Sequence, residues 1–148
     1  MKILFVCTGN TCRSPMAQIV GEKLINGIEF DSAGVFAIDG TEISDNAKKV
    51  LLEKGYNSGD FKSKRVTKEI FKDFNLILTM TQEQKEILKT FFLEEKDKIY
   101  TLKEYNSDKE EFGEIADPFG GDLQIYTKIL LDIELEILKL KSRLRNNS

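Results

Sequence analysis

A cysteine and an arginine bracket a short polar loop near the start of the chain, Cys7-Thr8-Gly9-Asn10-Thr11-Cys12-Arg13-Ser14. The loop follows an apolar, strand-like run at residues 2–6 and leads into Pro15, a residue favoured in the first turn of a helix. Backbone N–H groups at such a position have no helical partner, and with the positive end of the helix dipole they bind anions. The loop therefore predicts a phosphate cradle with a thiol at its floor.

Three side chains and one glycine indicate how this loop would do chemistry. Gly9 is expected to let the chain turn tightly around the anion. Arg13 supplies a planar guanidinium that can hold two phosphoryl oxygens at once. The same positive surroundings stabilise a sulfur anion, so Cys7 should be largely thiolate at neutral pH, and Ser14 is close enough in sequence to hydrogen-bond it. The alternative, an ordinary buried cysteine followed by an unrelated arginine, is disfavoured by the strand before the loop and the helix start after it.

The loop and two distant segments resemble the low-molecular-weight protein tyrosine phosphatase family. The matching segments are residues 6–17, Ser32-Ala33-Gly34 and Asp117-Pro118-Phe119-Gly120-Gly121. They occur in the family's order over essentially the whole chain, and within the family they are most similar to the bacterial protein-arginine phosphatases. Gln18 departs from that pattern, which would place an acidic residue in this part of the first helix.

The resemblance implies a two-step phosphoryl transfer that needs no metal or cofactor. Cys7 would attack phosphorus in line while the loop amides and Arg13 bear the charge on the equatorial oxygens. Asp117 would protonate the leaving group and then accept a proton from the water that hydrolyses the phosphocysteine. Asn10 would fix the loop backbone. The expected substrate-binding residues are Thr8, Gly9, Asn10, Thr11, Cys12, Ser14, Phe36 and Phe119.

The predicted substrate depends mainly on Thr11. Its side chain is expected near the pocket mouth, where tyrosine phosphatases of the family carry a branched aliphatic residue. An aromatic ring packed over the hydroxyl would leave it unpaired at a cost of roughly 1–3 kcal/mol, whereas the nitrogens of a phosphoguanidine can interact with it. We therefore expect hydrolysis of phosphoarginine in proteins, in a pocket walled by Phe36 and Phe119. Weak support comes from acidic residues that suit a cationic leaving group, namely Glu104, Asp108, Glu110, Glu111, Glu114 and Asp122.

Three other functions stay open at this point. A tyrosine phosphatase would differ mainly in the polarity of the pocket. An arsenate reductase of the same architecture needs resolving cysteines beyond the loop, and the two cysteines of this chain both lie in the loop. A noncatalytic anion-binding module would form no phosphocysteine. Because the chain contains no histidine, Ser-His-Asp and Cys-His catalysis and histidine-liganded zinc are excluded.

Composition limits the setting and the partners. A chain of 148 residues with 41% hydrophobic content is expected to form one domain over residues 1–148. The net charge of -3 argues against nucleic-acid binding, and the basic stretch 62–65 reads as a solvated loop. No signal-peptide pattern, membrane-length apolar run or disulfide framework is present, which predicts a cytoplasmic protein that does not bind membranes. The expected partners are phosphorylated proteins, with inorganic phosphate as product and inhibitor.

Cys12 suggests redox control, an inference that leans on the family resemblance. It lies on the same curled loop as Cys7, so the two sulfurs are expected to come within disulfide range after oxidation of Cys7. Such a bridge would inactivate the enzyme reversibly and protect Cys7 from overoxidation. The alternative is that Cys12 merely packs under the loop.

Alternating strand and helix patterns must position these groups. Strands are predicted at 2–7, 28–33, 75–80 and 98–102, and helices at 15–26, 41–54, 67–73, 81–91 and 123–145, with a polar loop at 103–121. The final helix would bury Ile125, Ile129, Ile133, Ile137 and Leu140. This alternation predicts an α/β fold with a four-stranded parallel sheet and helices on both faces. We expect the strand order 2-1-3-4, in which the place of the third strand is supported mainly by the resemblance. Ligands in such sheets bind beyond the carboxyl ends of the strands, beside the first strand, where the Cys7 loop starts.

Overall fold

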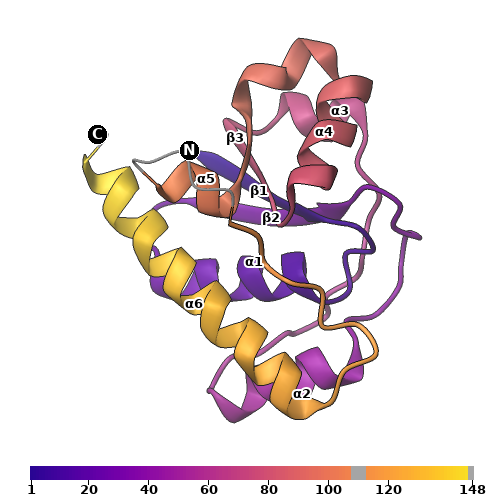
Figure 1. Cartoon of the computed structure of the whole chain (residues 1–148), viewed down its shortest axis with the longest axis vertical. Helices are drawn as coiled ribbons and strands as arrows, with labels where there is room; N and C mark the ends of the chain where they lie inside the picture. The colour runs from indigo at the N-terminus through magenta and orange to yellow at the C-terminus, as the bar shows by residue number, and fades with distance from the viewer. Residues whose placement is uncertain (108–112, 147–148) are drawn as a thin grey trace.

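The computed structural model describes residues 1–107 and 113–146, which form an α/β structure around one parallel sheet (Figure 1). The strands are β1 (Lys2–Cys7), β2 (Glu29–Gly34), β3 (Leu76–Thr79) and β4 (Ile99–Thr101). Their order is β2-β1-β3-β4, and each neighbouring pair is parallel, so the predicted sheet and strand order are confirmed.

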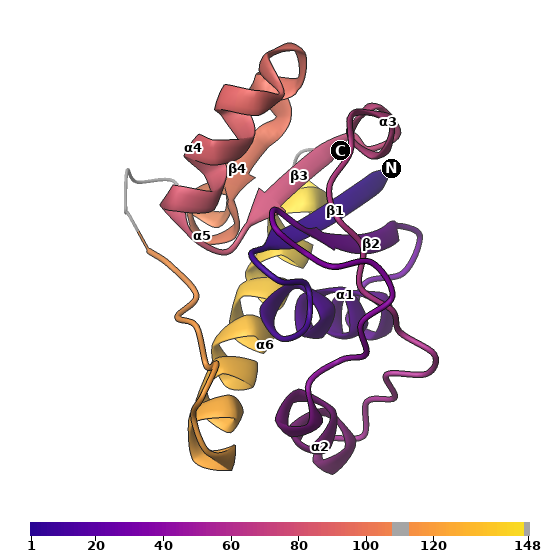
Figure 2. The same ribbon diagram turned by 90° about the vertical axis from the view of Figure 1, so that its right-hand side faces the viewer.

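Helices cover both faces of the sheet, as predicted. The helical segments are α1 (Arg13–Leu24), α2 (Asp45–Glu53), α3 (Lys68–Lys72), α4 (Gln82–Phe91), the 3-10 segment η1 (Leu93–Lys98), α5 (Leu102–Asn106) and α6 (Leu123–Asn146). Figure 2 shows α1 and α6 on one side of the sheet and α3 and α4 on the other. None of the helices in the described part of the chain is both long and apolar enough to cross a membrane.

Alternation along β1 explains why the sheet needs helices on both faces. Ile3 and Phe5 are fully buried in the core shared with α1 and α6, whereas Leu4 and Val6 are fully buried in the core shared with α3 and α4. Successive side chains of a strand point to opposite faces, so a strand that is apolar at every position must be covered twice. The sheet is therefore held rigidly between two cores.

The sheet register brings three strand ends together. Cys7, the last residue of β1, is paired with Gly34, the last residue of β2, and Val6 is paired with Thr79, the last residue of β3. In open parallel sheets ligands bind beyond the carboxyl ends of the strands. The polar loop that follows Cys7 lies at this edge.

The prediction of a loop at 103–121 is wrong for the first residues of this segment, because α5 occupies residues 102–106. Thr101 caps this short helix by accepting from the Glu104 N–H, and Glu104 in turn accepts from the Thr101 N–H. This capping box stabilises a helix start that hydrophobic periodicity cannot detect. The short helical segment η1 was also not predicted. Of the acidic residues expected near the site, Asp108, Glu110 and Glu111 lie outside the described residues.

The prediction for one residue of the apolar face of α6 is also wrong. Ile129, Ile133, Ile137 and Leu140 are buried as expected, but Ile125 is 44% exposed. Tyr126 occupies the buried position in this first turn instead. Residues three and four positions before Ile129 can both lie on its face of the helix, so periodicity alone does not choose between them.

Candidate active site

The sulfur of Cys7 lies in a buried hydrogen-bonding pocket at the end of β1. Its Sγ atom is 2.8 Å from Ser14 Oγ, and it accepts a hydrogen bond from the Asn10 backbone N–H at 3.3 Å. The loop curls back over the sulfur before α1 begins at Arg13. Two hydrogen-bonding groups are thus directed at one buried sulfur.

The side-chain amide of Asn10 determines the direction of these hydrogen bonds. Its Oδ1 accepts from the backbone N–H of Lys64 at 2.9 Å, and a backbone nitrogen can only donate. The amide nitrogen must therefore face the other way, where it donates to Ser14 Oγ at 2.8 Å and to Ser32 Oγ at 3.0 Å. Since Ser14 Oγ accepts from Asn10, its own proton is available to the sulfur.

Gln18 continues this chain of hydrogen bonds. Ser32 Oγ accepts from Asn10 and donates to Gln18 Oε1 at 2.6 Å, while Gln18 Nε2 donates to Glu22 at 2.8 Å. The group facing Ser32 is thus an oxygen acceptor, which an amide supplies as well as a carboxylate does. The departure of Gln18 from the expected acidic residue consequently leaves the network intact.

The conformation of the loop corrects the expectation for Gly9. Gly9 does not have a positive φ. Asn10 has a φ of 56° and is the only non-glycine residue in the left-handed region among the residues that the structure describes. Asparagine tolerates that region better than most residues, and here its buried amide bonds hold it there. The tight turn is therefore made by Asn10.

Gly34 is the glycine that the loop requires. A Cβ atom at this position would lie 2.7 Å from the carbonyl oxygen of Thr8, 2.8 Å from Ala37 Cβ and 3.0 Å from the Asn10 backbone nitrogen. The loop also docks on this segment through hydrogen bonds from Val35 N–H to Cys7 O and from Phe36 N–H to Thr8 O. The last residue of β2 must therefore lack a side chain.

Arg13 is buried, and a backbone carbonyl holds it in place. Its Nη1 donates to the carbonyl oxygen of Ile115 at 3.0 Å, and the Ile115 N–H donates to the carbonyl of Met80 just after β3. Ile115 is itself fully buried in the core on the α6 side. The guanidinium is thus fixed between the loop and the segment that carries Asp117.

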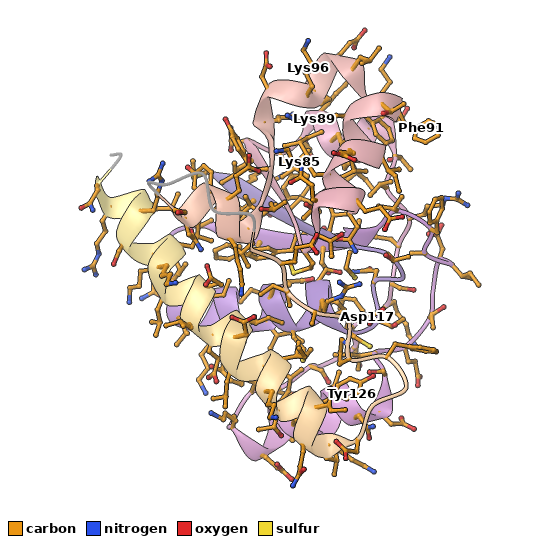
Figure 3. All side chains as sticks on the ribbon, viewed as in Figure 1. Lys85, Lys89, Phe91, Lys96, Asp117 and Tyr126 are labelled. Atoms are coloured by element: carbon orange, nitrogen blue, oxygen red, sulfur yellow. The ribbon has the colours of Figure 1, made fainter. Side chains whose placement is uncertain are left out.

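Asp117 lies opposite Arg13 on the connection that leads into α6. Its Oδ1 accepts from the Phe119 backbone N–H at 3.0 Å, and its Oδ2 is 3.7 Å from Arg13 Nη2. The side chain is more than half exposed, so it can reach a bound ligand. Figure 3 shows Asp117 on this connection and Tyr126 in the first turn of α6.

Two cavities meet at these residues. The cradle, with a volume of about 230 Å³, is lined by Cys7, Thr8, Gly9, Thr11, Cys12, Arg13, Asp117 and Phe119. A larger cavity of about 390 Å³ shares Thr8, Arg13 and Asp117 with the cradle and extends past Phe36 to α4. Phe119 and Phe36 are 82% and 57% exposed, so each is a wall residue and neither belongs to a core.

Ser14 and Cys12, two of the predicted substrate-binding residues, are buried, and their side chains bond to other protein groups. Ser14 is fully buried and faces the sulfur, as described above. Cys12 Sγ donates to Ser44 Oγ at 3.2 Å and is 3.4 Å from the hydroxyl oxygen of Tyr126. Burial, followed by the hydrogen bond with Cys12, raises the pKa of Tyr126. Both cysteines are free thiols.

Sequence reasoning missed the residues that act behind the site. Ser32 and Gly34 belong to a segment that resembles the family, but no role was predicted for either residue. No sequence pattern pointed to Ile115 or Gln84. Gln84 lies in the first turn of α4 and bonds Thr8. Together the arrangement can hold a dianion on loop amides and Arg13, attack it with sulfur, and move a proton through Asp117.

Comparisons with known proteins agree with this geometry. The family model for low molecular weight phosphotyrosine protein phosphatase matches residues 2–148. A protein-arginine-phosphatase of Geobacillus stearothermophilus is 44% identical over 145 residues, covering 97% of this chain and 96% of that protein. A low molecular weight protein-tyrosine-phosphatase, PtpB of Staphylococcus haemolyticus, is 37% identical over 148 residues, covering 100% of both.

A solved structure of an arginine phosphatase has a similar fold. The YwlE arginine phosphatase, as a C7S mutant with a phosphorylated active site serine, superposes with a TM-score of 0.94 at 35% sequence identity. The match covers 98% of this chain and 96% of that one. The likeness therefore extends over nearly the whole fold.

The close approach of β2 to the loop gives a test of the two glycines. Gly34→Ala should lower the free energy of unfolding by about 1–3 kcal/mol, because backbone atoms of the loop must move away from the new methyl group. Gly9→Ala is the matched control, since its Cβ would meet only Thr11 Oγ1, at 3.8 Å. Urea unfolding of both variants measures the difference. A Gly9→Ala variant that is the less stable of the two would contradict this description of the loop.

Proposed function

Because the chain belongs to the low-molecular-weight phosphotyrosine protein phosphatase family, we propose that it is a cysteine-dependent protein phosphatase that hydrolyses phosphoarginine in proteins. The observation that carries the proposal is the buried sulfur of Cys7 beneath an anion cradle, with Arg13 and Asp117 facing each other at its edge. The reaction is the hydrolysis of a phosphoramidate P–N bond.

In the first step, the Cys7 thiolate attacks phosphorus from the floor of the cradle. The loop N–H groups and the Arg13 guanidinium hold the equatorial oxygens and stabilise the charge on them. Asp117 donates a proton to the leaving nitrogen from the open side of the site, so the arginine side chain departs as its guanidinium cation when the P–N bond breaks. The dephosphorylated protein leaves, and a phosphocysteine remains.

In the second step, water displaces the thiolate. Asp117, now ionised, accepts a proton from this water, and inorganic phosphate is released. Ser14 donates to the departing sulfur and so stabilises it as a leaving group. The phosphorylated serine in the YwlE C7S mutant supports a phosphoryl-enzyme intermediate. Inorganic phosphate fits the same cradle and is proposed to inhibit as the product.

The substrate is argued from Thr11 and from the relatives. Thr11 lines the cradle, and its Oγ1 is 3.9 Å from Cys12 Sγ, so this hydroxyl has no strong partner within the described residues. A guanidinium nitrogen of the substrate can supply that partner, whereas an aromatic ring cannot. Two curated relatives are protein-arginine-phosphatases, and others are named protein-tyrosine-phosphatases. Phosphotyrosine hydrolysis is therefore the alternative.

A comparison of two substrates tests the proposed specificity. Matched peptides carrying phosphoarginine or phosphotyrosine at the same position are hydrolysed by the wild-type protein, and kcat/KM is measured for each. We expect the phosphoarginine peptide to be preferred by at least tenfold. A preference for phosphotyrosine would assign the chain to the alternative function.

Replacing Asp117 tests its role as a general acid. Asp117→Asn removes the donated proton, and the loss of kcat/KM should be roughly 10²–10⁴-fold on alkyl phosphates, whose alkoxides are poor leaving groups. An activated aryl phosphate, whose leaving group needs little protonation, is the internal control and should lose much less. Steady-state kinetics on both substrates decide the point. Equal losses would show that Asp117 is structural.

The hydroxyl of Thr11 is tested by two substitutions. Thr11→Val keeps the shape and removes the hydroxyl, and Thr11→Ile also adds apolar surface worth only about 1 kcal/mol to an aromatic substrate. Both variants should lower the phosphoarginine to phosphotyrosine ratio of kcat/KM at least tenfold, and Thr11→Ser should keep it. If kcat/KM falls equally for both substrates, Thr11 supports the loop and does not select the substrate.

We also propose that Cys12 protects Cys7 in a reducing, cytoplasmic setting. Peroxide would oxidise the Cys7 thiolate to a sulfenic acid, and the Cys12 thiol would then attack it with release of water to form a disulfide. Cys12 is buried and hydrogen-bonded to Ser44, so movement of the loop must accompany the step. The product is inactive until a thiol reduces it.

Oxidation of wild-type and Cys12→Ser proteins tests this protection. After mild peroxide treatment and dithiothreitol, we expect wild-type activity to return and Cys12→Ser activity to stay lost, because its unprotected Cys7 proceeds to sulfinic acid. Mass spectrometry should find a bridge between Cys7 and Cys12 before reduction. Sulfinic Cys7 beside a free Cys12 thiol as the main wild-type product would contradict the proposal.

A further inference from the structure

A second buried amide, that of Gln84, contacts the active-site loop from the opposite side. Gln84 is the N3 residue of α4 and is 3% exposed. Its Oε1 accepts from the backbone N–H groups of Met80 and Thr81, each at 3.0 Å, which caps the start of the helix. Its Nε2 donates to Thr8 Oγ1, also at 3.0 Å. One side chain thus joins the α4 cap to the residue after Cys7.

The direction of the Gln84 amide is fixed by its partners. The Thr81 backbone nitrogen can only donate, so the atom that faces it must be the amide oxygen. The amide nitrogen is then forced toward Thr8. Because Thr8 Oγ1 accepts this hydrogen bond, its own proton points elsewhere.

The hydrogen bond from Gln84 leaves the Thr8 hydroxyl proton available to a ligand. Thr8 is exposed and lines both the cradle and the larger cavity beside it. Within residues 1–107 and 113–146, its Oγ1 has no hydrogen-bond partner other than Gln84. A substrate guanidinium carries only donors, so the acceptor that a phosphorylated residue brings to this position is a phosphoryl oxygen.

We propose that Gln84 is a positioning residue that turns the Thr8 hydroxyl into a hydrogen-bond donor for a phosphoryl oxygen. The inference rests on the proposed function, since it assigns a further contact to the same phosphate. Hydrogen bonds to an anionic oxygen are the strong ones, so an oriented hydroxyl adds both affinity and a fixed angle. Gln84 thus acts on Thr8 as Asn10 acts on Ser14, with the phosphoryl group in place of the sulfur.

Gln84→Glu is the sharpest variant, because it reverses one hydrogen bond and keeps the others. A glutamate at N3 still accepts from the backbone N–H groups of a capping box. Its second oxygen cannot donate, so it accepts the Thr8 proton and takes it away from the site. Thr8→Val removes the hydroxyl with little change of shape, and Thr8→Ser keeps it as the matched control.

Binding of inorganic phosphate is measured for the wild type, Gln84→Glu, Thr8→Val, Thr8→Ser and the double variant Gln84→Glu/Thr8→Val. We expect the Kd for phosphate to rise roughly tenfold in Thr8→Val and in Gln84→Glu, as for one lost charge-assisted hydrogen bond. Thr8→Ser should bind like the wild type. The double variant should be close to Thr8→Val alone, because the hydroxyl that Gln84 orients is already gone.

Two results would overturn the inference. One is phosphate binding that equals the wild type in Thr8→Val or in a folded Gln84→Glu variant. The other is a double variant whose losses multiply, since the charge of the new glutamate would then act without the hydroxyl. Thermal unfolding checks that each variant folds. If Gln84→Glu does not, Gln84→Met replaces it, since it removes the donor to Thr8 at similar side-chain length and should also weaken phosphate binding. Phosphate binding requires no turnover, so failure of the phosphoarginine assignment would appear separately, in the two-substrate comparison.

Discussion

The donation of Asn10 Nδ2 to Ser14 Oγ is the interaction on which the reactive sulfur depends. The backbone N–H of Lys64 occupies the amide oxygen, so the nitrogen donates to Ser14 and Ser32. The Ser14 proton is then left for the Cys7 sulfur at 2.8 Å, with the Ala33 carbonyl oxygen at 3.5 Å as its more distant alternative acceptor. A buried sulfur anion without such donors would be costly. The direction of one amide therefore decides whether the Ser14 hydroxyl can donate to the Cys7 sulfur.

The parallel sheet makes this network possible by bringing distant segments to one edge. Ser32 meets Asn10 because β2 lies beside β1, and Lys64 meets it because its segment pairs with the end of β2 at Gly34. Gly34 allows the loop backbone to approach without a side chain between them. On the other side, the carbonyl of Ile115 anchors Arg13. The site is thus assembled around the end of β1 by hydrogen bonds from distant segments, which suits chemistry that relies on preorganised charge.

Sequence patterns predicted the parts of this structure that depend on local preference. The alternating apolar runs, the loop before Pro15 and the Asp-Pro pair placed the sheet, the cradle and Asp117. The patterns failed where partners come from afar. The residue in the left-handed region is Asn10 and not Gly9, and Tyr126, which contacts Cys12, is buried where Ile125 was expected. Gln84 could not be identified either, since its role exists only once α4 is docked against Thr8.

The most direct test of the mechanism is to trap the phosphoryl group on the protein. An arginine-phosphorylated protein substrate is mixed with the enzyme, the reaction is quenched within one turnover, and peptides are sequenced by mass spectrometry under conditions that preserve P–S bonds. The proposed mechanism predicts a phosphoryl group on Cys7 that forms and decays fast enough to account for turnover. Turnover of phosphoarginine with Cys7 unmodified throughout, or at an unchanged rate in Cys7→Ser, would contradict it.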